Sequence, residues 1–230
     1  MTDIAANLQQ IRDDIRETAR QYQRDPDEIR LLAVSKTKPV GDLLDAIHAG
    51  QKDFGENYLD EALDKIAALQ GQGCHWHFIG SIQSRKARDI ATHFDWVHTV
   101  DRLKVARKLS EHRPPQLPPL QCCLQVNIDN EDSKSGVSAA ALPDLLAGVE
   151  ALPRLQVRGL MVIPAPSDNP AIQRDSFRRT RELMASLQTP VRQLDTLSMG
   201  MSGDMAAAIA EGSTIVRIGT AIFGARPTRM

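Results

Sequence analysis

Eight short apolar runs, each followed by a stretch with helical spacing or by a closing turn, constrain the fold of this 230-residue chain more than any other feature. Alternation of strand and helix candidates is typical of a parallel sheet whose strands are joined by helical crossovers. Eight such units favour closure, so we expect an α/β fold, a single (β/α)8 barrel of the TIM type. The expected strands are 29–35, 52–58, 75–80, 94–100, 120–128, 155–163, 194–200 and 213–219.

The segments around these runs predict the rest of the architecture. Ile4, Leu8, Ile11 and Ile15 recur at helical spacing and indicate an extra N-terminal helix that covers the barrel. Further helices are expected to open at Pro39–Gly41 and to cover 59–70, 101–112, 138–152, 175–187 and 202–212. The proline-rich segments 113–119 and 163–170 are short, and we interpret them as loops within one domain that spans residues 1–230.

An open doubly wound sheet is the alternative architecture. Its dinucleotide-binding form carries a glycine fingerprint in the first turn between strand and helix, and residues 35–41 lack it. This argues against a Rossmann enzyme.

The charge balance and the termini exclude several classes of partner. The 28 Lys and Arg against 29 Asp and Glu give a net charge of −1, so we expect no nucleic-acid partner. No apolar run approaches the roughly 18 residues of a membrane span, and the charged start does not resemble a secretory signal. We therefore expect a cytoplasmic protein that does not bind membranes.

The cysteines and histidines offer two further hypotheses. Cys122 and Cys123 are adjacent, and in a strand they would point to opposite faces, which favours two buried thiols over a redox pair. His75 and His77 have a spacing that suits a metal, but no third ligand is near in sequence, so we expect no metal site.

The active site of a β/α barrel forms at the carboxyl ends of its strands, and Lys36 follows the first of them. A lysine there is partly desolvated, which favours the neutral amine that attacks a carbonyl to make a Schiff base. The alternative is a solvated cationic rim formed with Lys38.

The loops after the last two strands would suit a phosphate. The first contains Ser198, Ser202 and Gly203, and the second contains Gly219 and Thr220. Small residues and a helix start let backbone N–H groups approach an anion closely, although ordinary tight turns would have the same composition. Arg217 shares a face with Gly219, where it could keep a pyridine nitrogen unprotonated, contact a phosphate or form a structural ion pair.

Seven motifs in order along the chain carry a resemblance to a known family. They are LLAVSKTKP, FGENYLDEALDK, WHFIGSIQSRK, VNIDNEDSKSG, RGLMVIP, LSMGMSGDM and GSTIVRIGTAIFG. With them the chain resembles the pyridoxal 5′-phosphate (PLP) homeostasis proteins, whose single barrel is similar to the N-terminal domain of alanine racemase.

The resemblance implies a function and a set of site residues. It implies that PLP is held as an aldimine on Lys36, with Ser202, Gly219, Thr220 and also Ser198 as phosphate ligands, Arg217 facing the pyridine nitrogen and Asn57 lining the mouth. It further implies a monomer that maintains vitamin B6 homeostasis and delivers the cofactor to PLP-dependent apoenzymes. Lys134 corresponds to a family lysine linked to cofactor handling, against the alternative of a solvated loop lysine.

A small PLP-dependent racemase or transaminase-like enzyme is the alternative function. Racemisation needs a second acid or base on the opposite face of the substrate, and in alanine racemase a tyrosine from an added domain supplies it. We expect the barrel to use the whole chain, which leaves Tyr58 as the rival acid, or else as a packing or ligand contact. We therefore expect a carrier and not an enzyme.

Overall fold

The computed structural model describes residues 2–131 and 135–225, and within them eight parallel strands close into one barrel. Each strand pairs with the next along the chain, and the last returns to the first, where Leu32 lies opposite Arg217. The expected (β/α)8 barrel is confirmed, and the open doubly wound alternative is wrong. The strands are β1 (Arg30–Val34), β2 (Asp53–Glu56), β3 (His75–Phe78), β4 (Trp96–Val100), β5 (Leu120–Val126), β6 (Leu155–Val162), β7 (Thr196–Ser198) and β8 (Ile215–Ile218).

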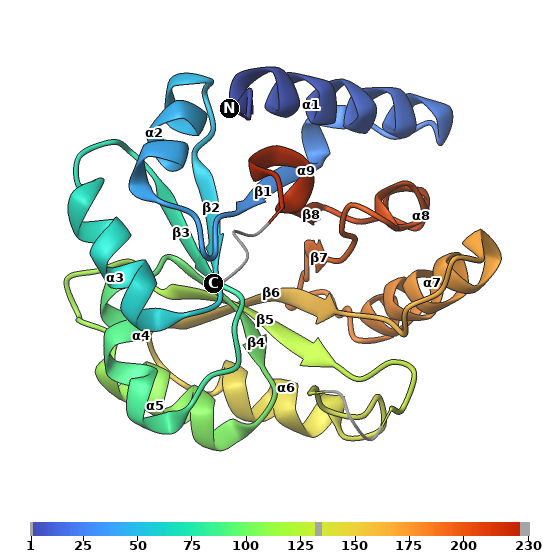
Figure 1. The fold of residues 1–230 in the computed structure, drawn as a ribbon. Helices are drawn as coiled ribbons and strands as arrows, with labels where there is room; N and C mark the ends of the chain where they lie inside the picture. Colours follow the sequence, from blue (N-terminus) through green and yellow to red (C-terminus); the bar gives the residue numbers. More distant parts are fainter. Residues whose placement is uncertain (1, 132–134, 226–230) are drawn as a thin grey trace.

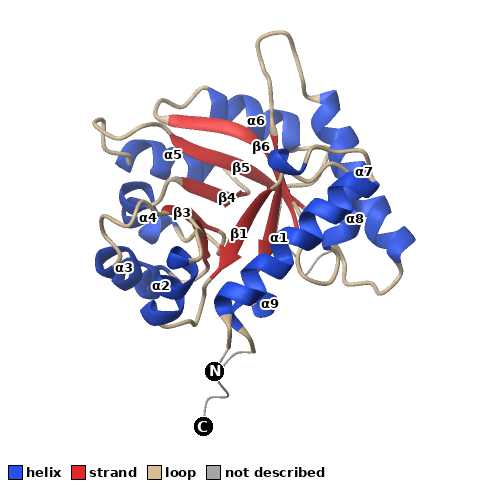
Figure 2. Ribbon diagram, turned by 90° about the horizontal axis from the view of Figure 1, so that it is seen from above, coloured by secondary structure: helices blue, strands red, loops and turns tan. Residues whose placement is uncertain are grey.

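The helices lie outside the strands and cover the barrel on all sides (Figure 1 and Figure 2). Their apolar faces and the outward side chains of the strands form the main core. In the described residues they are α1 (Ile4–Gln21), α2 (Val40–His48), α3 (Leu59–Ala68), α4 (Ala87–His93), α5 (Leu103–His112), α6 (Leu142–Glu150), α7 (Pro170–Ser186), α8 (Met205–Ala210) and α9 (Thr220–Phe223). None of them is long and apolar enough to cross a lipid bilayer.

The extra N-terminal helix is present as expected. Asp3 caps α1 by accepting a hydrogen bond from Ala6 N, and the predicted stripe of Ile4, Leu8, Ile11 and Ile15 is buried. This face packs against α2, α8 and α9, and α1 lies beside α9 in Figure 1. The N-terminal helix therefore supports the two short helices that follow the last strands.

One helix begins earlier than its spacing indicated. We expected a helix from residue 175, whereas α7 starts at Pro170. The Asn169 side chain accepts a hydrogen bond from Ala171 N, and proline suits the first helical position because its missing N–H would have no partner there. The predicted loop 113–119 connects α5 to β5, and the predicted loop 163–170 connects β6 to α7, although its last residue, Pro170, already belongs to the helix.

Cys122 and Cys123 point to opposite sides of β5, as the strand alternation predicted. Cys122 packs in the main core beneath the helices, whereas Cys123 lies inside the barrel with Trp96 and Met161. Both are buried free thiols, and burial raises the pKa of Cys123 to about 12. Two protonated thiols on opposite faces have no geometry for a redox pair.

Candidate functional site

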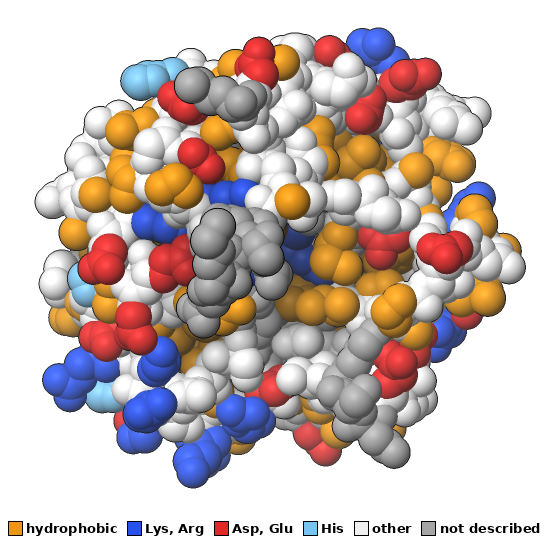
Figure 3. All heavy atoms as spheres, viewed as in Figure 1, with side chains coloured by type: hydrophobic (Ala, Val, Ile, Leu, Met, Phe, Trp, Pro, Cys, Tyr) orange, Lys and Arg blue, Asp and Glu red, His pale blue; other side chains and the backbone are white. Residues whose placement is uncertain are grey.

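A cavity of about 360 Å³ opens at the carboxyl ends of the strands. It is lined by six of the seven residues expected at the site: Lys36, Asn57, Ser202, Arg217, Gly219 and Thr220. The rest of the lining consists of Gly203 and the apolar side chains of Val34, Ile79, Met161, Ile163 and Met201. Figure 3 shows hydrophobic side chains gathered around a hollow near the centre of one face of the molecule. The expectation that the site lies at the carboxyl ends of the strands thus located the polar groups of the cavity. It did not indicate Ile79 and Ile163, which differ in no way from the other residues of their apolar runs.

Lys36 sits in a tight turn directly after β1. Lys38 N donates to Ser35 O at 3.1 Å, and Thr37 adopts a left-handed φ of 64°. Such a conformation is rare for a β-branched residue and must be held by its surroundings. Thr37 N donates to Glu61 Oε1 at 2.6 Å, so the start of α3 holds the turn.

A buried ion pair lies behind this turn. Lys65 Nζ donates to Ser35 O at 2.7 Å and to Glu56 Oε1 at 2.8 Å, and it also contacts Glu61. Burial raises the pKa of the Glu56 carboxyl, and the Lys65 ammonium acts in the opposite sense. We did not foresee this pair, although a lysine on the apolar face of a helix, in register with Leu59 and Ala62, was a usable signal.

Lys38 does not form a solvated rim with Lys36. Its Nζ donates to the carbonyls of Phe223, Gly224 and Ala225 at 2.7–2.9 Å. A lysine at the carboxyl end of a helix satisfies carbonyls that lack partners within the helix. Lys38 thereby ties the end of α9 to the Lys36 turn.

Arg217 enters the cavity from the middle of the barrel. Its Nη1 donates to Ser198 O at 2.6 Å and to Ser198 Oγ at 2.9 Å, and its Nη2 donates to Val162 O at 2.9 Å. Burial lowers the pKa of the guanidinium to about 10, which leaves it charged at neutral pH. All three of these acceptors are neutral, so the hydrogen bonds that hold the cation in place do not include a bond to a carboxylate.

Ser198 is the one predicted site residue that does not line the cavity. Its hydroxyl is fully buried beneath Arg217, between the guanidinium and His98 Nδ1, which is 2.7 Å away. The sequence suggested a hydroxyl on the rim, but β7 is only three residues long and its last side chain points into the barrel.

The two loops that we expected to bind an anion meet at the cavity. Ser202 and Gly203 precede α8, and Gly219 is the N-cap of α9, which begins at Thr220. A Cβ on Gly219 would lie 3.1 Å from Val34 O, so glycine allows this close approach of β8 to β1. The first N–H groups of a helix have no partner within it and favour negative charge. This wall of the cavity can therefore receive a phosphate.

Asn57 supplies an unsatisfied polar atom. Its Oδ1 is buried and has no hydrogen-bond partner in the described part of the chain. The backbone here is tightly packed, since a Cβ on Gly80 would lie 2.1 Å from Asn57 O. A buried acceptor that lacks a donor is costly unless a ligand supplies one.

The remaining candidates lie elsewhere. Tyr58 is 51% exposed at the start of α3 and is not part of the cavity lining. Residues 2–131 and 135–225 contain no group of His, Cys, Asp and Glu that could hold a metal; instead, His75 and His77 both lie next to Asp53. Lys134 lies outside the described residues.

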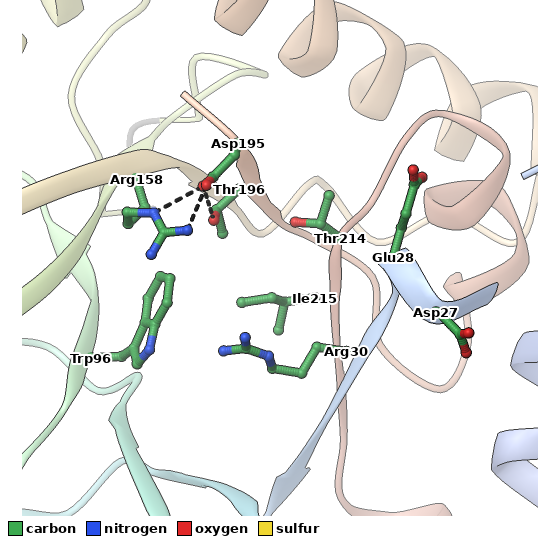
Figure 4. Close-up of a pocket in the computed structure, with 9 residues that line it drawn as sticks. All are labelled: Asp27, Glu28, Arg30, Trp96, Arg158, Asp195, Thr196, Thr214 and Ile215. Atoms are coloured by element: carbon green, nitrogen blue, oxygen red, sulfur yellow. Dashed lines mark hydrogen bonds and ion pairs between the residues drawn. The ribbon is translucent and has the colours of Figure 1, made fainter. Parts of the chain in front are cut away.

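A second pocket, of about 460 Å³, lies at the opposite end of the barrel (Figure 4). Two of its charges are paired with each other: Arg158 binds Asp195 through two nitrogens and lies 5.2 Å from the Trp96 ring centre. Arg30 lies over the same ring at 5.5 Å. None of the expected site residues lines this pocket, and it offers no lysine, so it is not the candidate site.

The chain is similar to one domain family over nearly its full length. The family model described as "Alanine racemase, N-terminal domain" matches residues 6–227. The pyridoxal phosphate homeostasis protein of Escherichia coli strain K12 is 54% identical over 229 residues, with 98% of each chain covered. The protein of the same name from Pseudomonas aeruginosa is 56% identical over 226 residues, which are 98% of this chain and 97% of that protein.

Solved structures agree with this match. PipY of Synechococcus elongatus with PLP bound aligns with a TM-score of 0.82 at 36% identity, covering 96% of this chain and all of that one. The alanine racemase of Corynebacterium glutamicum aligns with a TM-score of 0.70 at 18% identity, which shows a shared fold. The aligned region is 98% of this chain and 62% of the racemase.

Proposed function

The chain belongs to the alanine racemase N-terminal domain family and, within it, to the pyridoxal phosphate homeostasis proteins, and from this premise we propose that it binds PLP and maintains its intracellular level. The observation that carries the proposal is the meeting of Lys36, Arg217 and two glycine-containing loops in one cavity. When bound, PLP supplies an aldehyde that bonds reversibly to amines.

The residues present suit each part of that cofactor. Lys36 provides the amine that condenses with the aldehyde, with loss of one water. Ser202, Gly219 and Thr220 receive the phosphate at the starts of α8 and α9. Arg217 faces the pyridine nitrogen, and because it stays charged it keeps that nitrogen unprotonated. Asn57 lines the mouth and has a buried oxygen that requires a donor.

Ser198 has a different part in this proposal from the one expected of it. Its hydroxyl contacts Arg217, and it is fully buried, so we assign it to the support of the guanidinium and not to the phosphate.

We propose that the protein holds PLP and does not turn over amino acids. The close relatives carry homeostasis names, and an unprotonated pyridine nitrogen is a weak electron sink. Tyr58, the rival acid, is half exposed outside the cavity lining. Assays for racemisation and transamination on a panel of amino acids test this statement, and sustained turnover that Tyr58→Phe abolishes would refute it.

Covalent capture at Lys36 is the first prediction. Adding PLP to the purified protein should shift the absorption band of the cofactor, because a carbon–nitrogen double bond to Lys36 replaces the carbonyl group that is conjugated with the pyridine ring. Borohydride reduction followed by peptide mapping should then locate the label on Lys36. In Lys36→Ala the shift of the band should be lost, and PLP binding should weaken by at least about tenfold, since the covalent bond is gone.

Lys104→Ala is the matched control, because Lys104 is an exposed lysine on α5. It should leave the absorption band and the labelled peptide unchanged. A label spread over Lys38, Lys86 and Lys104 in the unmodified protein would contradict the proposed function.

Four wider properties complete the proposal. We propose that the protein is cytoplasmic, is a monomer, forms a single domain over residues 1–230 and passes PLP to apoenzymes that need it. The balanced net charge of −1 supports the absence of a nucleic-acid partner. Light scattering tests the monomer, and reactivation of an apoenzyme by the loaded protein, in the presence of a scavenger of free PLP, tests transfer.

A further inference from the structure

A continuous chain of hydrogen bonds crosses the inside of the barrel from the cavity to the opposite end. Ser198 Oγ lies 2.9 Å from Arg217 Nη1 and 2.7 Å from His98 Nδ1. His98 Nε2 lies 2.9 Å from His77 Nδ1, and His77 Nε2 lies 3.1 Å from Asp53 Oδ1. These five residues come from β8, β7, β4, β3 and β2, and nothing in the proposed function uses the two histidines.

The donors and acceptors at the two ends of this hydrogen-bond chain determine one position for each proton in it. Asp53 is an acceptor when ionised, so His77 carries its proton on Nε2, and its Nδ1 must accept. His98 then donates from Nε2, and its Nδ1 accepts from the Ser198 hydroxyl. Arg217 can only donate, so it donates to Ser198 Oγ. All four bonds therefore run in one direction, from the cation in the cavity to the anion at the far end.

The opposite direction would require an unfavourable charge state. It would place a proton on His77 Nδ1, and the bare Nε2 would then face Asp53 Oδ1, which would have to be protonated. The pKa of Asp53 is instead held below its usual range by His77 and by Arg30 and His75, despite burial acting in the other direction. Burial also lowers the pKa of His77 and of His98, which keeps both rings neutral.

We propose that Ser198, His98 and His77 are positioning residues for Arg217, and that together they couple its guanidinium to the carboxylate of Asp53 across the barrel. The effect of these residues on PLP binding rests on the proposed function, but the direction of donation along the hydrogen-bond chain does not. With the Ser198 proton committed to His98, the hydroxyl presents only lone pairs to Arg217, which fixes the orientation of the cation in the cavity.

The surroundings of the chain hold the rings in place. His77 stacks on Trp96 with ring centres 5.5 Å apart and an angle of 7° between the planes. Figure 4 shows Trp96 and Arg30 at this end of the barrel, and Arg30 Nη1 lies 3.7 Å from Asp53 Oδ1. Two further titratable groups lie near these residues: His75 Nδ1 is 3.4 Å from Asp53 Oδ1, and Asp95 acts to raise the pKa of His77. Movement of either ring is thereby restricted.

The direction of the chain can be tested on the protein without any ligand. Long-range nitrogen–proton NMR on protein with labelled histidine reports which ring nitrogen carries the proton. We expect His77 and His98 to be neutral with the proton on Nε2 between pH 6.5 and 8. A proton on Nδ1 of either ring, or a charged ring in this range, would overturn the proposal.

Two carboxylate variants test the far end of the chain. Asp53→Ala removes the anionic acceptor at the far end of the hydrogen-bond chain, so both proton positions should appear on His77 and on His98. Asp195→Ala, at the same end of the barrel but outside the chain, should leave both rings unchanged. If Asp53→Ala leaves them unchanged too, Asp53 does not set the direction and the proposal fails.

Two serine variants test the end next to Arg217. Ser198→Ala should weaken PLP binding by about tenfold, because a charged hydrogen bond that orients Arg217 is lost, and Ser198→Thr should restore most of it. Ser213→Ala is the matched control, since Ser213 is equally buried but its hydroxyl bonds only to backbone carbonyls. Equal weakening by Ser198→Ala and Ser213→Ala would mean a merely structural role and would reject the proposal. Failure of the unmodified protein to bind PLP would reject the proposed function, and the NMR result would still decide the direction of the chain.

Discussion

Thr37 lies in the turn that presents Lys36, and its backbone adopts a conformation that its own side chain disfavours. Its φ of 64° places an exposed, β-branched residue in the left-handed region. A residue with a Cβ pays roughly 1–2 kcal/mol there, which glycine does not. The turn persists because Glu61 accepts from Thr37 N and Lys65 holds Ser35 O, so α3 fixes the position of the lysine.

Replacing Thr37 by glycine should therefore stabilise the protein. Thr37→Gly relieves the strain and adds chain entropy to the unfolded state, and the net gain should be about 0.5–1 kcal/mol in the free energy of unfolding. Thr37→Ala keeps the Cβ and should show no gain. Urea denaturation of the three proteins measures the difference, and equal stability of the glycine and alanine variants would mean that the turn is not strained.

The strands and most of the long helices were predictable because each depends on a local pattern, whereas α4 (Ala87–His93), in a polar stretch, was not predicted. Apolar runs bounded by polar turns predicted all eight strands, and the spacing of Ile4, Leu8, Ile11 and Ile15 predicted α1. The start of α7 was predicted late because its first turn, at Pro170, lacks the apolar repeat and is instead defined by a cap. Patterns predict where an apolar face exists, whereas a cap depends on single side chains.

A prediction for the N-terminal helix concerns whether α1 unfolds cooperatively with the barrel. Leu8 is fully buried in the face of α1 that packs on α9, so Leu8→Ala should lower the free energy of unfolding by about 3 kcal/mol. Gln9→Ala, on the exposed face of the same helix, should change it by less than about 0.5 kcal/mol. Chemical denaturation gives both values. A small effect of Leu8→Ala would show that α1 is not part of the cooperative fold.

On the scale of the whole molecule, the hydrogen-bond chain that crosses the barrel could not be predicted from the sequence. Lys36 and Arg217 were found because strand ends and strand alternation are local rules. The link from Ser198 to His98 joins residues 100 positions apart, and that from His98 to His77 spans 21, so no window of sequence contains it. Nothing in the sequence around His98 indicates its partners, which became visible only in the closed barrel.

The same buried histidines should make the whole fold sensitive to acid. Burial lowers the pKa of both His77 and His98, so the folded chain keeps them neutral while the unfolded chain takes up protons below about pH 6.5. The contribution of the two histidines to the free energy of unfolding is therefore complete above that pH. It falls with decreasing pH, by up to about 1.4 kcal/mol per pH unit for each ring. Burial raises the pKa of Glu56 and of Asp204, and these two carboxyls act in the opposite sense.

We predict that the free energy of unfolding falls between pH 7 and pH 5, because in this range the unfolded chain protonates both histidines, whereas burial keeps them neutral in the folded chain. Urea denaturation at the two pH values measures the loss. His98→Gln should reduce the pH dependence by about half, since one of the two buried rings is gone. His48→Gln should leave it unchanged, because His48 is exposed on α2. Equal stability of the unmodified protein at pH 7 and pH 5 would mean that the histidines inside the barrel accept protons without loss of the fold, and that they are not held neutral as the hydrogen-bond chain requires.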